Sequence, residues 1–191
     1  CEAGTPTFLF DLHTDGIEFY FGDGHVTHHL YGAKVITAHI RELMQGAPFV
    51  LGATDAGRAK WVESLSRQLS VDPAFVYKRR DPATGEVALT GVNADVRGLS
   101  VVIYDDMIRT GSSLISAAKA YLEAGASSVH AVASHLVLPP GAYEKLRDSG
   151  LFESLSGTDS HPRSRVLEPP FGRVRSVAGL FADAIQISER R

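Results

Sequence analysis

The chain has 191 residues, enough for one domain or for one domain and part of another, and its 44% hydrophobic and 21% charged residues are typical of a globular protein. The net charge of −3 gives no general electrostatic reason to bind nucleic acid. No apolar run reaches membrane-spanning length, and no charged-then-apolar pattern at the start of the given sequence is typical of a signal peptide. The single cysteine, Cys1, excludes an internal disulfide framework. We therefore expect a cytoplasmic protein that contacts neither nucleic acid nor a membrane.

Short apolar segments alternate with helical patterns along the chain, which is typical of an α/β protein with a mostly parallel sheet flanked by helices. The patterns predict strands at residues 7–10, 49–52, 74–77, 101–104 and 129–134, and the stretch at residues 152–156 continues the alternation. They predict helices at residues 33–44, 58–69, 112–124, 142–148 and 179–188. Residues 86–92 alternate as an edge strand or hairpin does, whereas residues 81–85 and the proline-rich, basic residues 160–173 are expected to be loops.

The opening residues look like the glycine-capped end of a helix that leads into a strand, and residues 122–133 repeat this order. We therefore expect the chain to begin inside a domain. Residues 1–45 would be the end of a truncated N-terminal domain, residues 46–175 a C-terminal domain, and residues 176–191 a closing helix.

The stretch with the clearest chemistry is VVIYDDMIRTGSSL at residues 101–114, where a predicted strand leads to two carboxylates, a small polar turn and a helix. Ligands of open parallel sheets bind beyond the carboxyl ends of the strands. Thr110, Gly111, Ser112 and Ser113 would form a turn whose backbone N–H groups suit a phosphate. Asp105 and Asp106 suit sugar hydroxyls or a divalent cation beside that phosphate. By itself, the pattern also fits turn residues and a helix cap.

The whole string resembles the phosphoribosyl-pyrophosphate loop of the type I phosphoribosyltransferase fold. The chain as a whole is similar to the C-terminal part of ribose-phosphate diphosphokinases, which make phosphoribosyl pyrophosphate from ATP and ribose 5-phosphate. The resemblance rests on an ordered set of motifs, namely FLFDLHTDGIEFYF, GATDAGRAK, YKRRD, EVALTGV, ASHLVL and RVRSVAGLFADAI.

This resemblance implies roles for individual residues. His13 would bind the Mg²⁺ that accompanies ATP, and Asp55 would bind the ribose and a second Mg²⁺. Asp105 and Asp106 would hold the ribose hydroxyls, while Lys78 and Arg80 would act on the polyphosphate during transfer. The loop that would hold the 5-phosphate is Thr110, Gly111, Ser112 and Ser113. A homo-oligomer is also implied.

Four positions depart from the family pattern. Arg109 stands where many relatives carry an acidic residue, Thr54 and Arg58 stand where proline and a second glycine are common, and Leu136 replaces a usual glycine. The ATP-base pocket of the family precedes the Asp-Leu-His strand, so we expect these residues alone to have weak synthetase activity or none.

The remaining polar and aromatic residues of note are expected to have no ligand or catalytic role. His25, His28 and His29 are expected to be loop residues without a ligand role, since no cysteine or carboxylate cluster accompanies them. Trp61 and Leu65 are expected to lie in the core.

Two other functions stay open. A nucleobase phosphoribosyltransferase would share the acidic loop but would not need the FDLHTDG and YKRRD motifs. A regulatory paralogue without catalysis would bind ribose phosphates, and Arg58 and Arg109 would be its signature.

Overall fold

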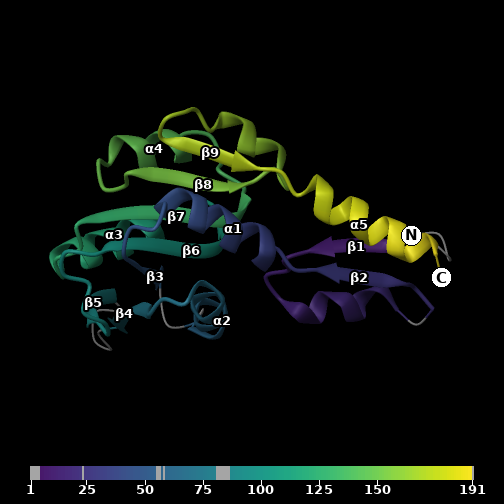
Figure 1. Ribbon diagram of the computed structural model, residues 1–191, viewed down its shortest axis with the longest axis horizontal. Helices are drawn as coiled ribbons and strands as arrows, with labels where there is room; N and C mark the ends of the chain where they lie inside the picture. The colour runs from purple at the N-terminus through teal and green to yellow at the C-terminus, as the bar shows by residue number, and fades with distance from the viewer. Residues whose placement is uncertain (1–4, 23, 55–56, 58, 81–86, 191) are drawn as a thin grey trace.

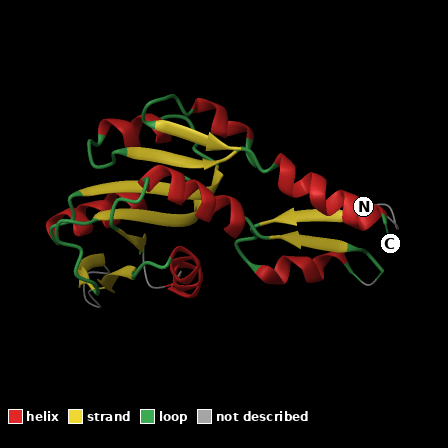
Figure 2. Cartoon of the chain, in the orientation of Figure 1, coloured by secondary structure: helices red, strands yellow, loops and turns green. Residues whose placement is uncertain are grey.

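Strands and helices alternate along the chain in the computed structural model, as predicted (Figures 1 and 2). The structure describes residues 5–22, 24–54, 57, 59–80 and 87–190, without the side chains of residues 15, 78–80 and 87–90. The strands are β1 Thr7–Phe10, β2 Thr27–Leu30, β3 Phe49–Ala53, β4 Pro73–Arg80, β5 Val87–Val92, β6 Ser100–Ile108, β7 Ser128–Leu136, β8 Ser154–Thr158 and β9 Gly172–Arg175. The helices are η1 Asp15–Phe21, α1 Ala33–Met44, α2 Ala59–Leu69, α3 Ser112–Glu123, α4 Ala142–Asp148, η3 Pro162–Val166 and α5 Ala178–Glu189.

Seven strands form one sheet in the order β5-β4-β3-β6-β7-β8-β9. All neighbours in this sheet are parallel except β4 and β5, which pair antiparallel at one edge. The edge strand or hairpin predicted at residues 86–92 is confirmed over residues 87–92, and the α/β class with a mostly parallel sheet flanked by helices is confirmed as well.

The central strands are apolar because helices cover both faces of the sheet. Residues 101–104 of β6 are all buried. One apolar cluster joins α3 and α4 to one face, with Tyr121 and Leu146 fully buried in it. The other joins α1 and α2 to the opposite face and includes Ile40 and Leu65. Leu65 lies in the core as predicted, while Trp61 is only half-buried.

A separate parallel pair, β1 with β2, lies at one end of the molecule, where α5 runs alongside it (Figure 1). The rings of Phe10 on β1 and Phe181 on α5 lie 6.0 Å apart. The first and last segments of the chain therefore meet, although residues 49–175 of the large sheet separate them in sequence.

Three predictions are corrected. β6 continues to Ile108, so Asp105 and Asp106 lie within the strand. Residues 160–173 are not a plain loop, because they contain η3 and the start of β9, which pairs along the edge of β8. His28 and His29 belong to β2 and not to a loop. Residues 81–85, expected to be a loop, lie outside the described residues.

Candidate active site

A cleft of about 700 Å³ opens where β3 and β6 end. The carboxyl ends of parallel strands meet at one edge of a sheet, so polar residues from distant parts of the sequence gather there. The lining residues are His13, Thr54, Gly57, Asp105, Asp106, Met107, Arg109 and Ser113. The cleft brings the Asp-Leu-His motif and the acidic stretch together.

His13 and Asp106 join the two motifs directly. The Nδ1 atom of His13 lies 2.7 Å from Oδ2 of Asp106. The His13 side chain is 63% exposed, whereas that of Asp106 is 11% exposed. Asp105 turns its Oδ1 back to accept a hydrogen bond from the backbone N–H of Asp106, 3.0 Å away. The cleft therefore holds two adjacent carboxylates and one imidazole.

A second cleft of about 330 Å³ adjoins the first, because residues Asp105, Met107, Arg109 and Ser113 line both. The second is formed by the loop before α3, including Thr110, Gly111 and Ser112. Gly111 has a φ of 73°, in the left-handed region that favours glycine, and it directly precedes the first turn of α3. Unpaired N–H groups and the positive end of the helix dipole make this turn suitable for an anion.

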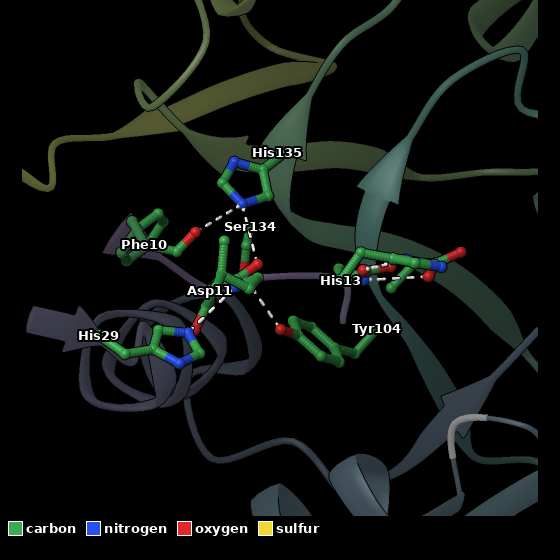
Figure 3. Close-up of polar contacts among 10 residues, drawn as sticks. Phe10, Asp11, His13, His29, Tyr104, Ser134 and His135 are labelled. Atoms are coloured by element: carbon green, nitrogen blue, oxygen red, sulfur yellow. Dashed lines mark hydrogen bonds and ion pairs between the residues drawn. The ribbon is translucent and has the colours of Figure 1, made fainter. Parts of the chain in front are cut away.

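Behind His13, a buried network holds the end of β1 against the sheet (Figure 3). Asp11 is 3% exposed, and its carboxylate accepts hydrogen bonds from the backbone N–H of Gly32 and from the hydroxyl of Ser134. Ser134 also contacts the Tyr104 hydroxyl at 3.0 Å. Burial raises the pKa of Tyr104, and the nearby Asp11 charge raises it further. A buried carboxylate is tolerated here because donors satisfy it.

Two histidines fix the backbone of the same segment. The Nε2 atom of His135 lies 3.1 Å from the carbonyl oxygens of both Phe10 and Asp11. The N–H of Leu12 donates to Nε2 of His29 over 3.1 Å. His13 therefore follows a turn whose polar groups are held from two sides, which fixes the direction in which its ring enters the cleft.

The other predicted residues fall into two groups. Thr54 is buried and Arg109 is exposed at the rim of both clefts. Asp55 and Arg58 lie outside the described residues, and so do the side chains of Lys78 and Arg80, although both of these residues belong to β4.

The structure also accounts for Leu136, which replaces a usual glycine of the family. Its side chain is fully buried against Gly157 of the neighbouring strand β8. A Cβ atom at Gly157 would lie only 2.6 Å from Cγ of Leu136. The Leu136 side chain on β7 thus fills the space that Gly157 leaves open on β8.

Sequence reasoning assigned no site role to Asp11, Tyr104, Ser134 or His135. A signal was present, because Asp11 and the Ser134–His135 pair each stand at the end of an apolar strand. Their mutual contact joins residues more than 120 positions apart, so only the folded chain reveals it.

The donor set of the cleft fits a hard divalent cation such as Mg²⁺, which prefers oxygen ligands and is often held by one or two carboxylates together with water and substrate phosphates. The resemblance assigns this cation to His13, which lines the cleft, and to Asp55, while Asp105 and Asp106 supply negative charge beside it. Within the described ranges, no three histidine, cysteine, aspartate or glutamate residues are grouped so as to hold a metal by themselves.

Several known proteins are similar to this chain. The chain is 33% identical over 184 residues to a ribose-phosphate pyrophosphokinase of Gloeobacter violaceus, covering 96% of this chain and 54% of that protein. It is 36% identical over 186 residues to the one of Porphyromonas gingivalis, with 97% and 58% covered. The phosphoribosylpyrophosphate synthetase of Mycobacterium smegmatis superposes with a TM-score of 0.84 at 30% identity, over 97% of this chain and 59% of that one.

The chain thus spans about half the length of these relatives, and it is homologous to the C-terminal half of the ribose-phosphate pyrophosphokinases. Among the described residues, no helix has the length and apolar content needed to cross a bilayer. The family model of the phosphoribosyl transferase domain matches residues 29–159, which include β6, the acidic pair and the loop before α3. The chain therefore belongs to the phosphoribosyltransferase family.

Proposed function

We propose that the two clefts form the ribose 5-phosphate site of a ribose-phosphate diphosphokinase, which transfers the diphosphoryl group of ATP to ribose 5-phosphate. The contact between His13 and Asp106, at 2.7 Å, carries this proposal. A phosphoribosyltransferase that uses a nucleobase needs the acidic loop but has no need for an imidazole from a separate Asp-Leu-His segment beside it.

In this proposal each group of residues has a separate task. Asp105 and Asp106 accept hydrogen bonds from the 2- and 3-hydroxyls of ribose, since carboxylates are strong acceptors. The N–H groups and hydroxyls of Thr110, Gly111, Ser112 and Ser113 bind the 5-phosphate at the N-terminus of α3. The sugar is then fixed at both ends, and its anomeric hydroxyl points into the larger cleft.

The reaction moves one intact diphosphoryl group. The anomeric oxygen attacks the β-phosphorus of ATP, the bond from that phosphorus to the oxygen shared with the α-phosphorus breaks, and AMP leaves with that oxygen. The anomeric hydroxyl loses its proton to solvent. Lys78 and Arg80 would stabilise the charge on the transferred phosphates, while His13 and Asp55 would hold Mg²⁺. When bound, Mg²⁺ supplies charge neutralisation on the polyphosphate.

We propose two structural units, with a C-terminal domain at residues 46–175 and an N-terminal unit that includes residues 1–45, whose helix α1 packs across the boundary onto the large sheet. Helix α5, within residues 176–191, returns to β1 and β2. A parallel pair of two strands is too small to be stable by itself, so its edges suit further strands. The relatives are nearly twice as long as the matched region, and we propose that the adenine of ATP binds to that other half. Assembly into a homo-oligomer stays a prediction.

The test is mass spectrometry of the products when the full-length gene product is given Mg²⁺, ATP and ribose 5-phosphate. The proposal expects AMP and phosphoribosyl pyrophosphate in equal amounts. Asp105→Asn and Asp106→Asn should each lower kcat/KM at least about tenfold, the loss of one charge-assisted hydrogen bond. Asp95→Asn is the matched control, because Asp95 is an exposed carboxylate paired with Arg97 and does not line either cleft.

Other products would point to the alternatives. Pyrophosphate release from phosphoribosyl pyrophosphate and a free base would favour a nucleobase phosphoribosyltransferase. Binding of ribose 5-phosphate without any AMP would favour a regulatory protein and would contradict the proposed reaction.

A further inference from the structure

Helix α4 packs directly against the loop that would bind the 5-phosphate. Leu146 of α4 is fully buried, and a Cβ atom placed on Gly111 would lie 2.7 Å from its Cδ2 atom. The loop and α4 are therefore in van der Waals contact at Gly111. The residue before Leu146 is Lys145, so the anchored leucine fixes where the lysine stands.

Lys145 reaches the first residue of α3. Its Nζ atom donates a hydrogen bond of 2.9 Å to Oγ of Ser112, and the Thr110 hydroxyl donates to the same oxygen over 3.3 Å. Lys145 is exposed, and among the described residues no carboxylate forms an ion pair with it. An ammonium group therefore stands beside the N-terminal turn of a helix.

In the absence of a bound anion, this position is electrostatically unfavourable for the Lys145 ammonium group. The helix dipole places partial positive charge at the N-terminus of α3, so a lysine there is repelled and an anion is attracted. A phosphate dianion would reverse the sign of the interaction, because it can accept hydrogen bonds from the N–H groups of the turn and from an ammonium together. The loop hydroxyls are neutral, and Asp105 repels a phosphate. A cation at this point offsets that repulsion.

We infer that Lys145 is a substrate-binding residue that contacts the 5-phosphate of the sugar and makes the site select phosphorylated ribose. The inference rests on the proposed function and extends it to an element outside the acidic loop. When the phosphate binds, the Nζ atom of Lys145 would donate a hydrogen bond to a phosphate oxygen, either in place of its bond to Ser112 or in addition to it. Arg109, which lines the same cleft, would add a second positive charge near this phosphate.

The test is calorimetric titration of the protein with ribose 5-phosphate in Mg²⁺, for the wild type and for Lys145→Gln and Lys145→Arg. We expect Lys145→Gln to weaken binding about tenfold, and Lys145→Arg to keep affinity within about threefold, because it keeps the charge. The affinity of the wild type should also fall more steeply with added KCl, from about 50 to about 300 mM, than that of Lys145→Gln, because screening is strong at these salt concentrations.

Arg147→Gln is the matched control, because Arg147 is an exposed cation of the same helix that pairs with Asp148. It should bind ribose 5-phosphate as the wild type does. Equal melting temperatures of the variants would exclude a collapse of α4.

The outcomes separate the inference from the function on which it rests. If the wild type binds ribose 5-phosphate and Lys145→Gln binds it equally well, the inference is wrong and the proposed function stands. If Lys145→Gln and Arg147→Gln weaken binding alike, the effect belongs to the helix and the inference is also wrong. A wild type that does not bind ribose 5-phosphate overturns both.

Discussion

Gly111→Ala tests whether the loop before α3 depends on its contact with α4. Two costs add at this position. An alanine with φ of 73° is strained by about 1–2 kcal/mol, and its Cβ would lie 2.7 Å from a fully buried Leu146 side chain, an overpacking that typically costs about 1–3 kcal/mol. We expect Gly111→Ala to lower the free energy of unfolding by about 2–5 kcal/mol.

Gly98→Ala is the matched control, since Gly98 has a φ of 72° and a Cβ atom placed on it would have no other group within 4 Å. It should cost only the backbone strain, about 1–2 kcal/mol. Urea unfolding, followed by circular dichroism and by fluorescence of the single tryptophan, Trp61, measures both.

A double-mutant cycle isolates the steric clash between the added methyl group at position 111 and the Leu146 side chain. Adding Leu146→Ala to Gly111→Ala should cost about 1–3 kcal/mol less than the sum of the two single changes, because the truncated side chain leaves room for the new methyl group. Equal destabilisation by Gly111→Ala and Gly98→Ala, together with additive energies in the cycle, would refute the contact between α4 and the loop.

Three further predictions concern buried polar groups. Tyr121→Phe should destabilise the protein by about 1–3 kcal/mol in urea unfolding, because the Tyr121 hydroxyl lies within 2.9 Å of two buried backbone carbonyl oxygens. Ser134→Ala should destabilise the protein by a similar amount and raise the KM for the Mg²⁺-dependent reaction, since it removes a hydrogen-bond donor to the buried Asp11 carboxylate. An unchanged KM would show that the buried network does not position His13. Burial, followed by the charge of Arg175, lowers the pKa of His39 from 6.5 to about 4. The unfolded chain therefore binds a proton that the folded chain does not, so the free energy of unfolding falls as the pH drops from about 6.5 toward 4. In urea unfolding at about pH 7 and about pH 4.5, His39→Asn should show a smaller difference in the free energy of unfolding than the wild type. A wild-type stability that does not change over this range would contradict the assignment.

The sequence predicted the elements that local pattern controls. The boundaries of α1 and α4 agree with the predicted residues, because helical spacing acts within a few turns. The acidic pair and the loop before α3 could be predicted as a site because they are contiguous in the chain. The strand β9 could not be predicted, since its residues become a strand only by pairing with β8.

By itself, the sequence determined the chemistry at each strand end, meaning which residues carry a carboxylate, a hydroxyl or an imidazole. Only the tertiary structure decided which of these groups meet. The contact of Asp11 with Ser134 on β7 brings His13 to Asp106 across 93 positions, and the packing of α4 on the loop before α3 brings Lys145 to Ser112 across 33 positions. The physical reason is that burial of both sheet faces packs helices and the end of β1 close to the strand ends, whatever their separation along the chain.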